Sequence, residues 1–322
     1  MYPAIAIAGP TASGKSNLAL YLAERFDGEI VNYDSLQLFR HLNIGTAKPS
    51  AADQSRVPHH LIDILEPDED FSAGQYQWRA REVLNDIRKR KRVPILVGGT
   101  GLYLRAVIEG LFDGPQRSIY WRARMEIIAR EKGREYLHSL LERLDPSSAA
   151  RIAPRDLPKV IRAIEVRLTT GRSLSSHLDA APRRPIQGFK FNVVGLDPPR
   201  EALYERIEVR VRQMWEVGLV EEVTQILESG VAPEANAFRA IGYRQVLEYI
   251  DGAISLDEAI MLTGRETRRY AKRQLTWFKK QHSLTWFDGF GSEDEMKERI
   301  HQFIDHAFGN SGQSLNSASP GI

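Results

Sequence analysis

The feature that most constrains the fold is an apolar run that leads directly into a glycine-rich loop near the start of the chain. Residues 4–8 are all Ala or Ile, residues 9–16 are GPTASGKS, and apolar residues recur at helical spacing over 17–23. Strand, loop and helix therefore follow one another in the order that a phosphate-binding P-loop requires. This order predicts a P-loop NTPase-like α/β core, a mostly parallel sheet flanked by helices with a polyphosphate site at its carboxyl edge.

The residue types in the loop suit an anion. Gly9 and Gly14 let the backbone approach a phosphate closely, and the N–H groups of the loop and of the helix start point toward it. We expect Lys15 to reach the terminal phosphates and the Ser16 hydroxyl to ligate Mg²⁺. The predicted diphosphate- or nucleotide-binding residues are Gly9, Pro10, Thr11, Ala12, Ser13, Gly14, Lys15 and Ser16.

Length and composition favour a globular protein of two domains, or of one domain with a large insertion. The chain has 322 residues, of which 42% are hydrophobic and 27% charged. No apolar run approaches the roughly 18 residues that span a membrane, and cysteine is absent. We therefore expect a cytoplasmic protein with no membrane segment. The net charge of +2 means that nucleic-acid binding would have to depend on local basic patches.

Two further apolar segments predict strands that bring polar residues to the same edge of the sheet. Residues 28–33 lead to Asp34-Ser35-Leu36-Gln37, and residues 93–97 lead to Gly-Gly-Thr at 98–100. An ATP-hydrolysing P-loop protein usually has a Mg²⁺-binding Asp at the end of such a strand. Its absence after residue 97 argues against a motor or switch ATPase and draws attention to Asp34. Taken alone, Asp34 also fits a helix cap or a solvated loop, which are commoner roles.

The sequence changes character between residues 114 and 187. Three arginine-rich segments, 120–132, 134–144 and 157–170, have helical periodicity, and a strand pattern resumes at 189–196. The simplest interpretation is an all-helical domain inserted into the α/β domain, and its arginines fit either a nucleic-acid lobe or an ordinary surface. The predicted organisation is a P-loop core over 1–113, a helical insertion over 114–187, completion of the core with basic C-terminal helices over 188–308, and a disordered tail over 309–322.

Arginine and aromatic residues are interleaved in the last third of the chain. Residues 239–244 (RAIGYR) combine side chains suited to backbone contact and base stacking. Residues 265–280, within a helix predicted over 256–280, contain seven Lys or Arg and one acid, a local charge of 7 − 1 = +6. Such a charge density favours a polyanion as partner. A helix predicted over 201–217 places Arg206 and Arg210 on one face.

Together these motifs resemble the tRNA dimethylallyltransferase family, also called tRNA isopentenyltransferases. The resemblance covers about residues 3–308 and is specific because of the order of its motifs, which are GPTASGKS at 9–16, DSLQ at 34–37, GTAKP at 45–49, VGGTGLY at 97–103, RAIGYR at 239–244 and AKRQLTW at 271–277. It implies transfer of a dimethylallyl group from dimethylallyl diphosphate to N6 of the adenosine on the 3′ side of the anticodon. The tRNAs implied are those that read codons beginning with U.

The resemblance also implies catalytic roles for individual residues. Asp34 would remove a proton from the adenine amine, and Lys15 and Arg210 would bind the diphosphate. Thr100 would hydrogen-bond near the departing oxygen, and Mg²⁺ on Ser16 would be the cofactor. No step needs ATP hydrolysis, although the P-loop is a nucleotide-binding motif.

The implied partners are dimethylallyl diphosphate and the anticodon stem-loop of tRNA, and the implied state is a monomer. The target adenosine is stacked in that loop, so it must be extruded to reach a buried site. The residues implied to contact tRNA are Asp34, Ser35, Leu36, Gln37, Thr100, Arg122, Pro158, Lys159, Val160, Ile161, Arg162, Arg239, Ala240, Ile241, Gly242, Tyr243 and Arg244.

Two other functions stay open on the sequence alone. A small-molecule or nucleoside kinase would also use a strand, a P-loop, a helix and a following Asp, but it leaves the basic segment 265–280 unexplained. A non-catalytic RNA-binding module gated by a nucleoside triphosphate would use the basic helices and make no modified product. The three functions differ in what they produce, which is prenylated adenosine, a phosphorylated small molecule, or neither.

Overall fold

The structure is a computed structural model that describes residues 1–112, 114–180, 183–280 and 284–309. The chain divides into two compact units, one made of residues 1–107 and the chain from 187 onward, the other of residues 108–186. The disordered tail predicted at 309–322 lies, from residue 310 on, outside the described residues.

The first unit is built on a parallel sheet. In the described ranges its strands are β1 (Tyr2–Ala8), β2 (Gly28–Asn32), β3 (His59–His60), β4 (Val93–Val97), β5 (Phe189–Leu196) and β6 (Leu284–Phe287). Their order is β3-β2-β4-β1-β5-β6, and each neighbouring pair is parallel. Strands buried on both faces are the reason for the nearly continuous apolar runs in the sequence. The predicted α/β class with a mostly parallel sheet is confirmed.

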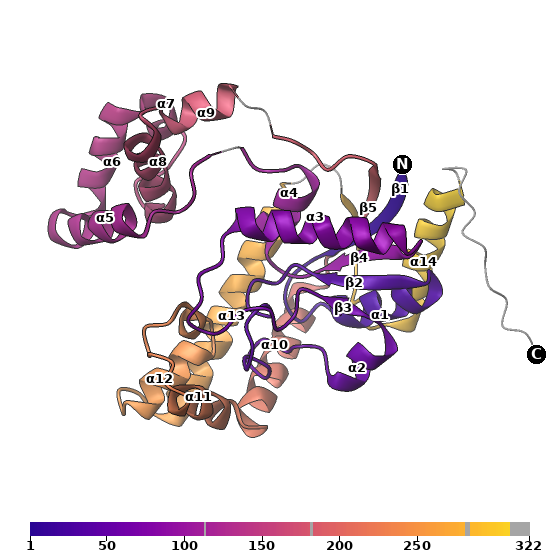
Figure 1. The fold of residues 1–322 in the computed structure, drawn as a ribbon. Coiled ribbons are helices and arrows are strands. Elements are labelled where there is room, and N and C mark those ends of the chain that lie inside the picture. The colour runs from indigo at the N-terminus through magenta and orange to yellow at the C-terminus, as the bar shows by residue number, and fades with distance from the viewer. Residues whose placement is uncertain (113, 181–182, 281–283, 310–322) are drawn as a thin grey trace, which may run out of the picture. The chain divides into compact units, whose positions relative to one another are not determined.

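Helices cover both faces of this sheet (Figure 1). α1 and α14 pack on one face in a core with Ile5, Ile7 and Ile300, while α3 lies over the other face, where the Tyr76 hydroxyl donates to the Asn32 carbonyl at 2.8 Å. The helices of the unit are α1 (Lys15–Arg25), α2 (Ala51–Arg56), α3 (Ala73–Lys89), α4 (Gly101–Ile108), α10 (Arg200–Glu216), α11 (Leu219–Glu228), α12 (Tyr243–Ile250), α13 (Leu256–Phe278) and α14 (Asp294–Gly309), with a 3-10 turn at Asn236–Arg239.

Local sequence determines where α3 begins and ends. The Ser72 hydroxyl accepts the Gln75 N–H at 3.2 Å, and the Gln75 side chain accepts the Ser72 N–H at 2.9 Å, which together form a capping box. The helix ends at Lys89 because Lys91, two residues later, has a φ of 60° and turns the chain into β4.

The carboxyl ends of β1, β2 and β4 meet at one edge of the sheet. β4 lies between the other two, and the register pairs Val97 with both Ile7 and Asn32. The three segments that follow these strands are therefore neighbours, although they are far apart in the sequence. Open parallel sheets bind their ligands at this kind of edge.

The second unit is helical throughout its described residues. Its helices are α5 (Ile119–Lys132), α6 (Arg134–Leu144), α7 (Pro146–Ala149), α8 (Leu157–Thr170) and α9 (Leu174–Ala180). Leu137, Leu141 and Ile164 are among the residues of its own core. The unit begins at residue 108, earlier than the predicted 114, because the Ile186 N–H donates to the Ile108 carbonyl at 3.0 Å and ties the entering segment to the leaving one.

A fully buried carboxylate, Glu165 of α8, organises the helical unit. It accepts the Ser118 N–H at 2.6 Å, the Arg122 guanidinium at 3.1 Å and the Arg162 guanidinium at 2.7 Å. Burial raises the pKa of Glu165, but these hydrogen bonds outweigh burial and hold the pKa below its ordinary value. Arg122 and Arg162, two of the implied tRNA contacts, are therefore ion-paired inside this unit.

We expect Glu165→Gln to destabilise the helical unit by about 1–3 kcal/mol, because it leaves two guanidinium groups without their charged acceptor. Chemical denaturation at pH 7 measures this loss, with Glu126→Gln on the exposed side of α5 as the control. The folded-state pKa of Glu165 is lowered, so its stabilisation is present at neutral pH and is lost as the carboxyl group is protonated in acid. The difference between wild type and variant should accordingly shrink as the pH falls; a constant difference would contradict the assignment.

Candidate active site

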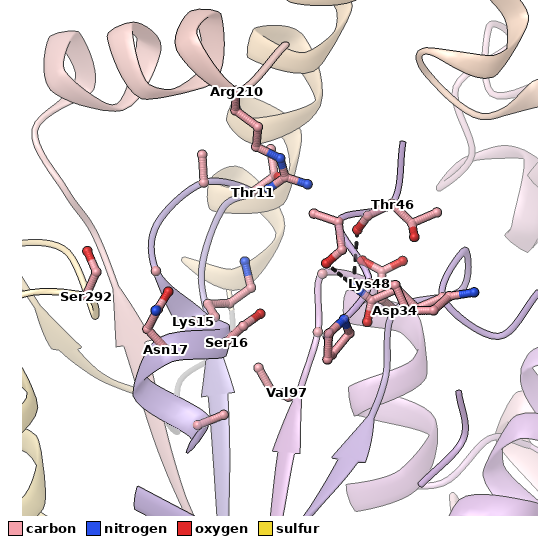
Figure 2. Close-up of a pocket in the computed structure, with 18 of the residues that line it drawn as sticks. Thr11, Lys15, Ser16, Asn17, Asp34, Thr46, Lys48, Val97, Arg210 and Ser292 are labelled. Carbon is pink, nitrogen blue, oxygen red and sulfur yellow. Dashed lines mark hydrogen bonds between the residues drawn. The ribbon is translucent and has the colours of Figure 1, made fainter. Parts of the chain in front are cut away.

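A cavity of about 1360 Å³ lies at the carboxyl edge of the sheet in the first unit. Figure 2 shows Thr11, Lys15 and Ser16 of the P-loop region below Arg210, and Asp34, which follows β2, across the cavity from them. Among the residues that line it are Thr11, Lys15, Ser16, Asp34, Gln37, Thr46, Lys48, Val97, Arg210, Tyr270, Gln274 and Ser292.

The P-loop has the predicted conformation between β1 and α1, and its second glycine is needed for a close approach. A Cβ on Gly14, whose φ is 84°, would lie 2.6 Å from the Ser292 nitrogen. The Gly291 N–H donates to the Ser13 carbonyl at 2.9 Å, so residues 291 and 292 brace the loop from outside. The Lys15 ammonium donates to the Pro10 carbonyl at 2.6 Å.

Lys15 and Arg210 face this cavity from the P-loop side. Burial lowers the pKa of Lys15 to about 7, with Asp34 opposing this shift and Arg210 adding to it. Burial also lowers the pKa of Arg210, and Asp34 raises it. The Arg210 guanidinium donates to the Thr11 hydroxyl at 3.3 Å, which fixes it beside the P-loop. Partly desolvated cations at a helix N-terminus attract an anion of more than one charge.

Asp34 is held in a turn directly after β2. The Asn32 side chain accepts the Asp34 N–H at 2.9 Å and donates to the Leu61 carbonyl at 2.8 Å. The Asp34 carboxylate accepts the Leu36 N–H at 3.0 Å. A local hydrogen bond of this kind is the ordinary loop role that the sequence also allowed for Asp34. The carboxylate in addition lines the cavity.

The pKa of Asp34 is raised from its ordinary value. Burial is the largest cause, and the Leu36 N–H, Lys15 and Arg210 act against it. A carboxylate with a raised pKa is a better proton acceptor than an exposed one, so the site combines a P-loop with a carboxylate suited to accept a proton.

Glycines let the turn at Asp34 approach the end of β4. A Cβ on Gly98 would lie 2.5 Å from the Tyr33 backbone, and one on Gly99 would lie 3.3 Å from a carboxylate oxygen of Asp34. The next residue, Thr100, accepts the Ser35 N–H at 3.0 Å and donates to the Ser35 hydroxyl at 3.1 Å. Thr100 therefore holds the backbone beside Asp34; its implied contact with a departing oxygen stays a prediction.

The implied tRNA contacts at 239–244 fall into exposed and buried side chains. Arg239 and Arg244 are exposed, whereas Ala240 and Tyr243 are buried. The Tyr243 hydroxyl donates to Glu222 at 2.6 Å, and Glu222 also accepts the N–H groups of residues 43 and 44 at 3.0 and 2.8 Å. A Cβ on Gly45 would lie 2.3 Å from the Tyr243 ring. Tyr243 thus packs under the loop that forms one wall of the cavity.

The implied contacts at 158–162 divide in the same way. Pro158 and Lys159 are exposed at the start of α8, Val160 and Ile161 belong to the core of the helical unit, and Arg162 binds Glu165. Of these residues, Lys159 and the ion-paired Arg162 present the polar side-chain groups that a phosphate backbone can use.

The basic segment of α13 has one exposed face. Arg265, Arg269, Lys272 and Arg273 are exposed, while Arg268 pairs with Glu208 on α10. Two residues of the site were not among the predicted ones. Gln274 is buried on the same helix, and the ring centroid of Phe290 lies 3.5 Å from the Arg206 guanidinium carbon. A polar residue on the apolar face of an amphipathic helix was the available signal for Gln274.

Two absences apply to the described ranges. None of the helices there is long and apolar enough to cross a membrane. No group of three or more His, Cys, Asp or Glu side chains that could hold a metal ion occurs in them either.

Known proteins match this chain over nearly its whole length. A sequence model described as IPP transferase matches residues 37–281. A tRNA dimethylallyltransferase of Solibacter usitatus is 50% identical over 307 residues, 94% of this chain and 99% of the relative. The crystal structure of a full-length tRNA isopentenylpyrophosphate transferase from Bacillus halodurans is 39% identical, with a TM-score of 0.72 and coverage of 97% and 98%. A eukaryotic dimethylallyltransferase acting on tRNA, 24% identical with a TM-score of 0.81, covers 99% of this chain and 82% of its own and shares the fold.

The fold and the cavity define a P-loop protein that has a carboxylate next to its phosphate loop. The chain belongs to the IPP transferase family, as its motifs predicted. The kinase and the gated RNA-binding module are not favoured by these relatives.

The low pKa of Lys15 predicts proton uptake when a polyphosphate binds. At pH 8 much of the Lys15 amine is neutral in the free protein, and a bound polyanion favours its charged form. We expect calorimetric titration with inorganic diphosphate, in buffers of different ionisation enthalpy, to show up to about one more proton taken up by wild type than by Lys15→Arg, whose guanidinium stays charged. The excess should disappear at pH 6, where Lys15 is already protonated. Equal uptake by both proteins at pH 8 would contradict a lowered pKa of Lys15 that anion binding restores.

Proposed function

We propose that this chain transfers a dimethylallyl group from dimethylallyl diphosphate to N6 of the adenosine on the 3′ side of the anticodon, in tRNAs that read codons beginning with U. The products are N6-dimethylallyladenosine and diphosphate. The observation that carries the proposal is the single cavity in which Asp34 lies opposite the P-loop, Lys15 and Arg210. The curated relative at 50% identity, named tRNA dimethylallyltransferase, supports it.

Asp34 supplies the base. The lone pair of the adenine amine is delocalised into the ring, so N6 is a weak nucleophile until it loses a proton. As the new C–N bond forms, the amine proton passes to the Asp34 carboxylate, a step typically worth ~10²–10⁴-fold in rate. The raised pKa of Asp34 suits it to this task.

The P-loop side of the cavity binds the leaving group. The allylic C–O bond breaks and its electron pair stays on the diphosphate, so negative charge grows on the bridging oxygen. Lys15, the N–H groups at the start of α1 and the Arg210 guanidinium are cationic or partly positive groups that stabilise this charge. They are in place before the reaction and need little reorganisation.

The donor set fits Mg²⁺ held largely by the substrate. Ser16 places an exposed hydroxyl at the first turn of α1 on the cavity wall. Mg²⁺ commonly takes few protein ligands and completes its shell with phosphate oxygens and water, so a cluster of carboxylates is unnecessary. We assign Ser16 as its protein ligand; when bound, the ion would add charge stabilisation to the diphosphate.

Exposed basic groups supply the tRNA surface. We propose that Arg239, Arg244 and the exposed face of α13 contact the phosphate backbone, and that Lys159, Arg122 and Arg162 do so from the helical unit. Gln37 lines the cavity and donates to the carbonyls of Thr46 and Ala47 at 3.1 and 3.2 Å, which orients its amide for the extruded base. We propose that the enzyme acts in the cytoplasm, where its tRNA substrate occurs. We also propose that the enzyme acts as a monomer.

Mass spectrometry of tRNA nucleosides tests the function and Asp34 together. Wild type incubated with unmodified tRNA, dimethylallyl diphosphate and Mg²⁺ should yield adenosine heavier by one C5H8 unit, at the position next to the anticodon. Phosphate transfer from ATP, or tRNA binding without a modified product, would instead support the kinase or the gated module.

In the same assay Asp34→Asn should lower kcat by ~10²–10⁴-fold and leave tRNA affinity nearly unchanged. Asp68→Asn, at an exposed loop position, is the matched control. Because the base must be ionised, wild-type kcat/KM should fall as the pH drops through the raised pKa of Asp34. Normal turnover of Asp34→Asn would remove Asp34 as the base.

Salt dependence tests the basic surface. Arg269→Gln combined with Lys272→Gln should weaken tRNA binding and reduce the slope of log Kd against log salt by roughly 0.7–0.9 for each lost phosphate contact. Arg299→Gln on the exposed side of α14, which removes one positive charge away from this face, serves as the control. A slope that is the same in all proteins would show that the α13 face does not bind the phosphate backbone.

A further inference from the structure

The buried amide of Gln274 lies where the two halves of the site meet. Gln274 is on the inward face of α13 and is 5% exposed, between the buried Ala271 and Phe278. A buried amide costs free energy unless its polar atoms are hydrogen-bonded.

Both ends of the amide are bonded, each to a different loop. Its oxygen accepts the Thr11 N–H at 2.8 Å, and its nitrogen donates to the Gly99 carbonyl at 3.0 Å. A backbone N–H can only donate and a carbonyl can only accept, so the partners determine the orientation of the amide. Gln274 thereby connects the P-loop after β1 to the turn after β4.

The absence of a side chain at residue 99 makes this bridge possible. A Cβ on Gly99 would lie 2.3 Å from the Gln274 nitrogen and 3.3 Å from a carboxylate oxygen of Asp34. Gln274 and Asp34 therefore approach the same glycine.

Each of the two loops that Gln274 binds helps to form the proposed binding site of one reactant. Thr11 also accepts a hydrogen bond from Arg210, which belongs to the diphosphate side. Gly99 precedes Thr100, which holds Ser35 and thus the turn of the base Asp34. The two hydrogen bonds of Gln274 therefore determine the distance between the P-loop, which would bind the leaving group, and the turn that carries Asp34.

We propose that Gln274 is a positioning residue for the transfer, which fixes the separation between the diphosphate loop and the Asp34 turn so that donor carbon and adenine amine meet in line. The inference rests on the proposed function. A displacement of about 1 Å in such an alignment can cost on the order of 10²-fold in rate, without a comparable loss of substrate binding.

Gln274→Glu is the informative variant because its hydrogen bonding depends on its protonation. The protonated acid can accept from Thr11 and donate to the Gly99 carbonyl, as the amide does, whereas the carboxylate cannot donate. We expect the ratio of variant to wild-type kcat to be highest at low pH and to fall by on the order of 10–10²-fold as the pH rises to 8.5. Asp34, Lys15, Arg210 and Tyr270 line the same cavity, and Tyr270 hydrogen-bonds to Gln274, so the pH profile of Gln274→Met is the reference against which that of Gln274→Glu is compared.

Further measurements distinguish positioning from mere structural support. KM for dimethylallyl diphosphate and Kd for tRNA should stay within about threefold of wild type, and Gln274→Met should lose kcat at every pH by on the order of 10–10²-fold. Circular dichroism at each pH checks that the variants are folded, and Gln302→Glu on the exposed side of α14 should give a flat ratio.

The outcomes separate the inference from the function on which it rests. A ratio for Gln274→Glu that does not change with pH, full kcat in Gln274→Met, or a loss explained by unfolding would overturn the positioning role while wild type still forms product. Absence of prenylated adenosine with wild type would overturn the proposed function itself.

Discussion

The site depends on Lys15, Arg210 and Asp34, which line the same partly buried cavity. Burial raises the pKa of Asp34, and the Lys15 and Arg210 charges act against this rise. The same two cations are the groups suited to a polyphosphate. An anion bound beside them would neutralise part of their charge, and the pKa of Asp34 would then rise. Under the proposed function, occupation of the anion site would therefore make Asp34 a stronger base and would link the order of binding to the chemistry.

The parts of the fold that depend on local pattern could be predicted from the sequence. The strand at 93–97 and the helices at 134–144 and 157–170 coincide with β4, α6 and α8, because apolar periodicity and caps are encoded in neighbouring residues. The P-loop is equally local. Motif order then identified the family, and the parallel sheet explains how Asp34 comes to lie beside that loop.

The rest depends on contacts between distant residues. The bridge from Gln274 to Thr11 spans 263 positions, and that from Arg210 to Thr11 spans 199. No local pattern predicts which buried polar side chain finds which loop. The burial of Tyr243 and the pairing of Arg122 with Glu165 were hidden for the same reason, since a motif gives residue types but not the side on which each one lies. The short edge strand β3 carries too few residues to show a periodicity.

The contact between Gly45 and Tyr243 has a consequence for how such a protein can evolve. The phenol ring occupies the space that a side chain at residue 45 would need, and its hydroxyl binds the carboxylate that holds the same loop. Neither position can be substituted alone. A larger residue at 45 requires a smaller residue at 243, and loss of the tyrosine also removes the hydrogen bond to Glu222. Substitutions at this wall of the cavity therefore have to occur at both positions together. Glycine is retained at residue 45 because the ring of a residue nearly two hundred positions away fills the space beside it.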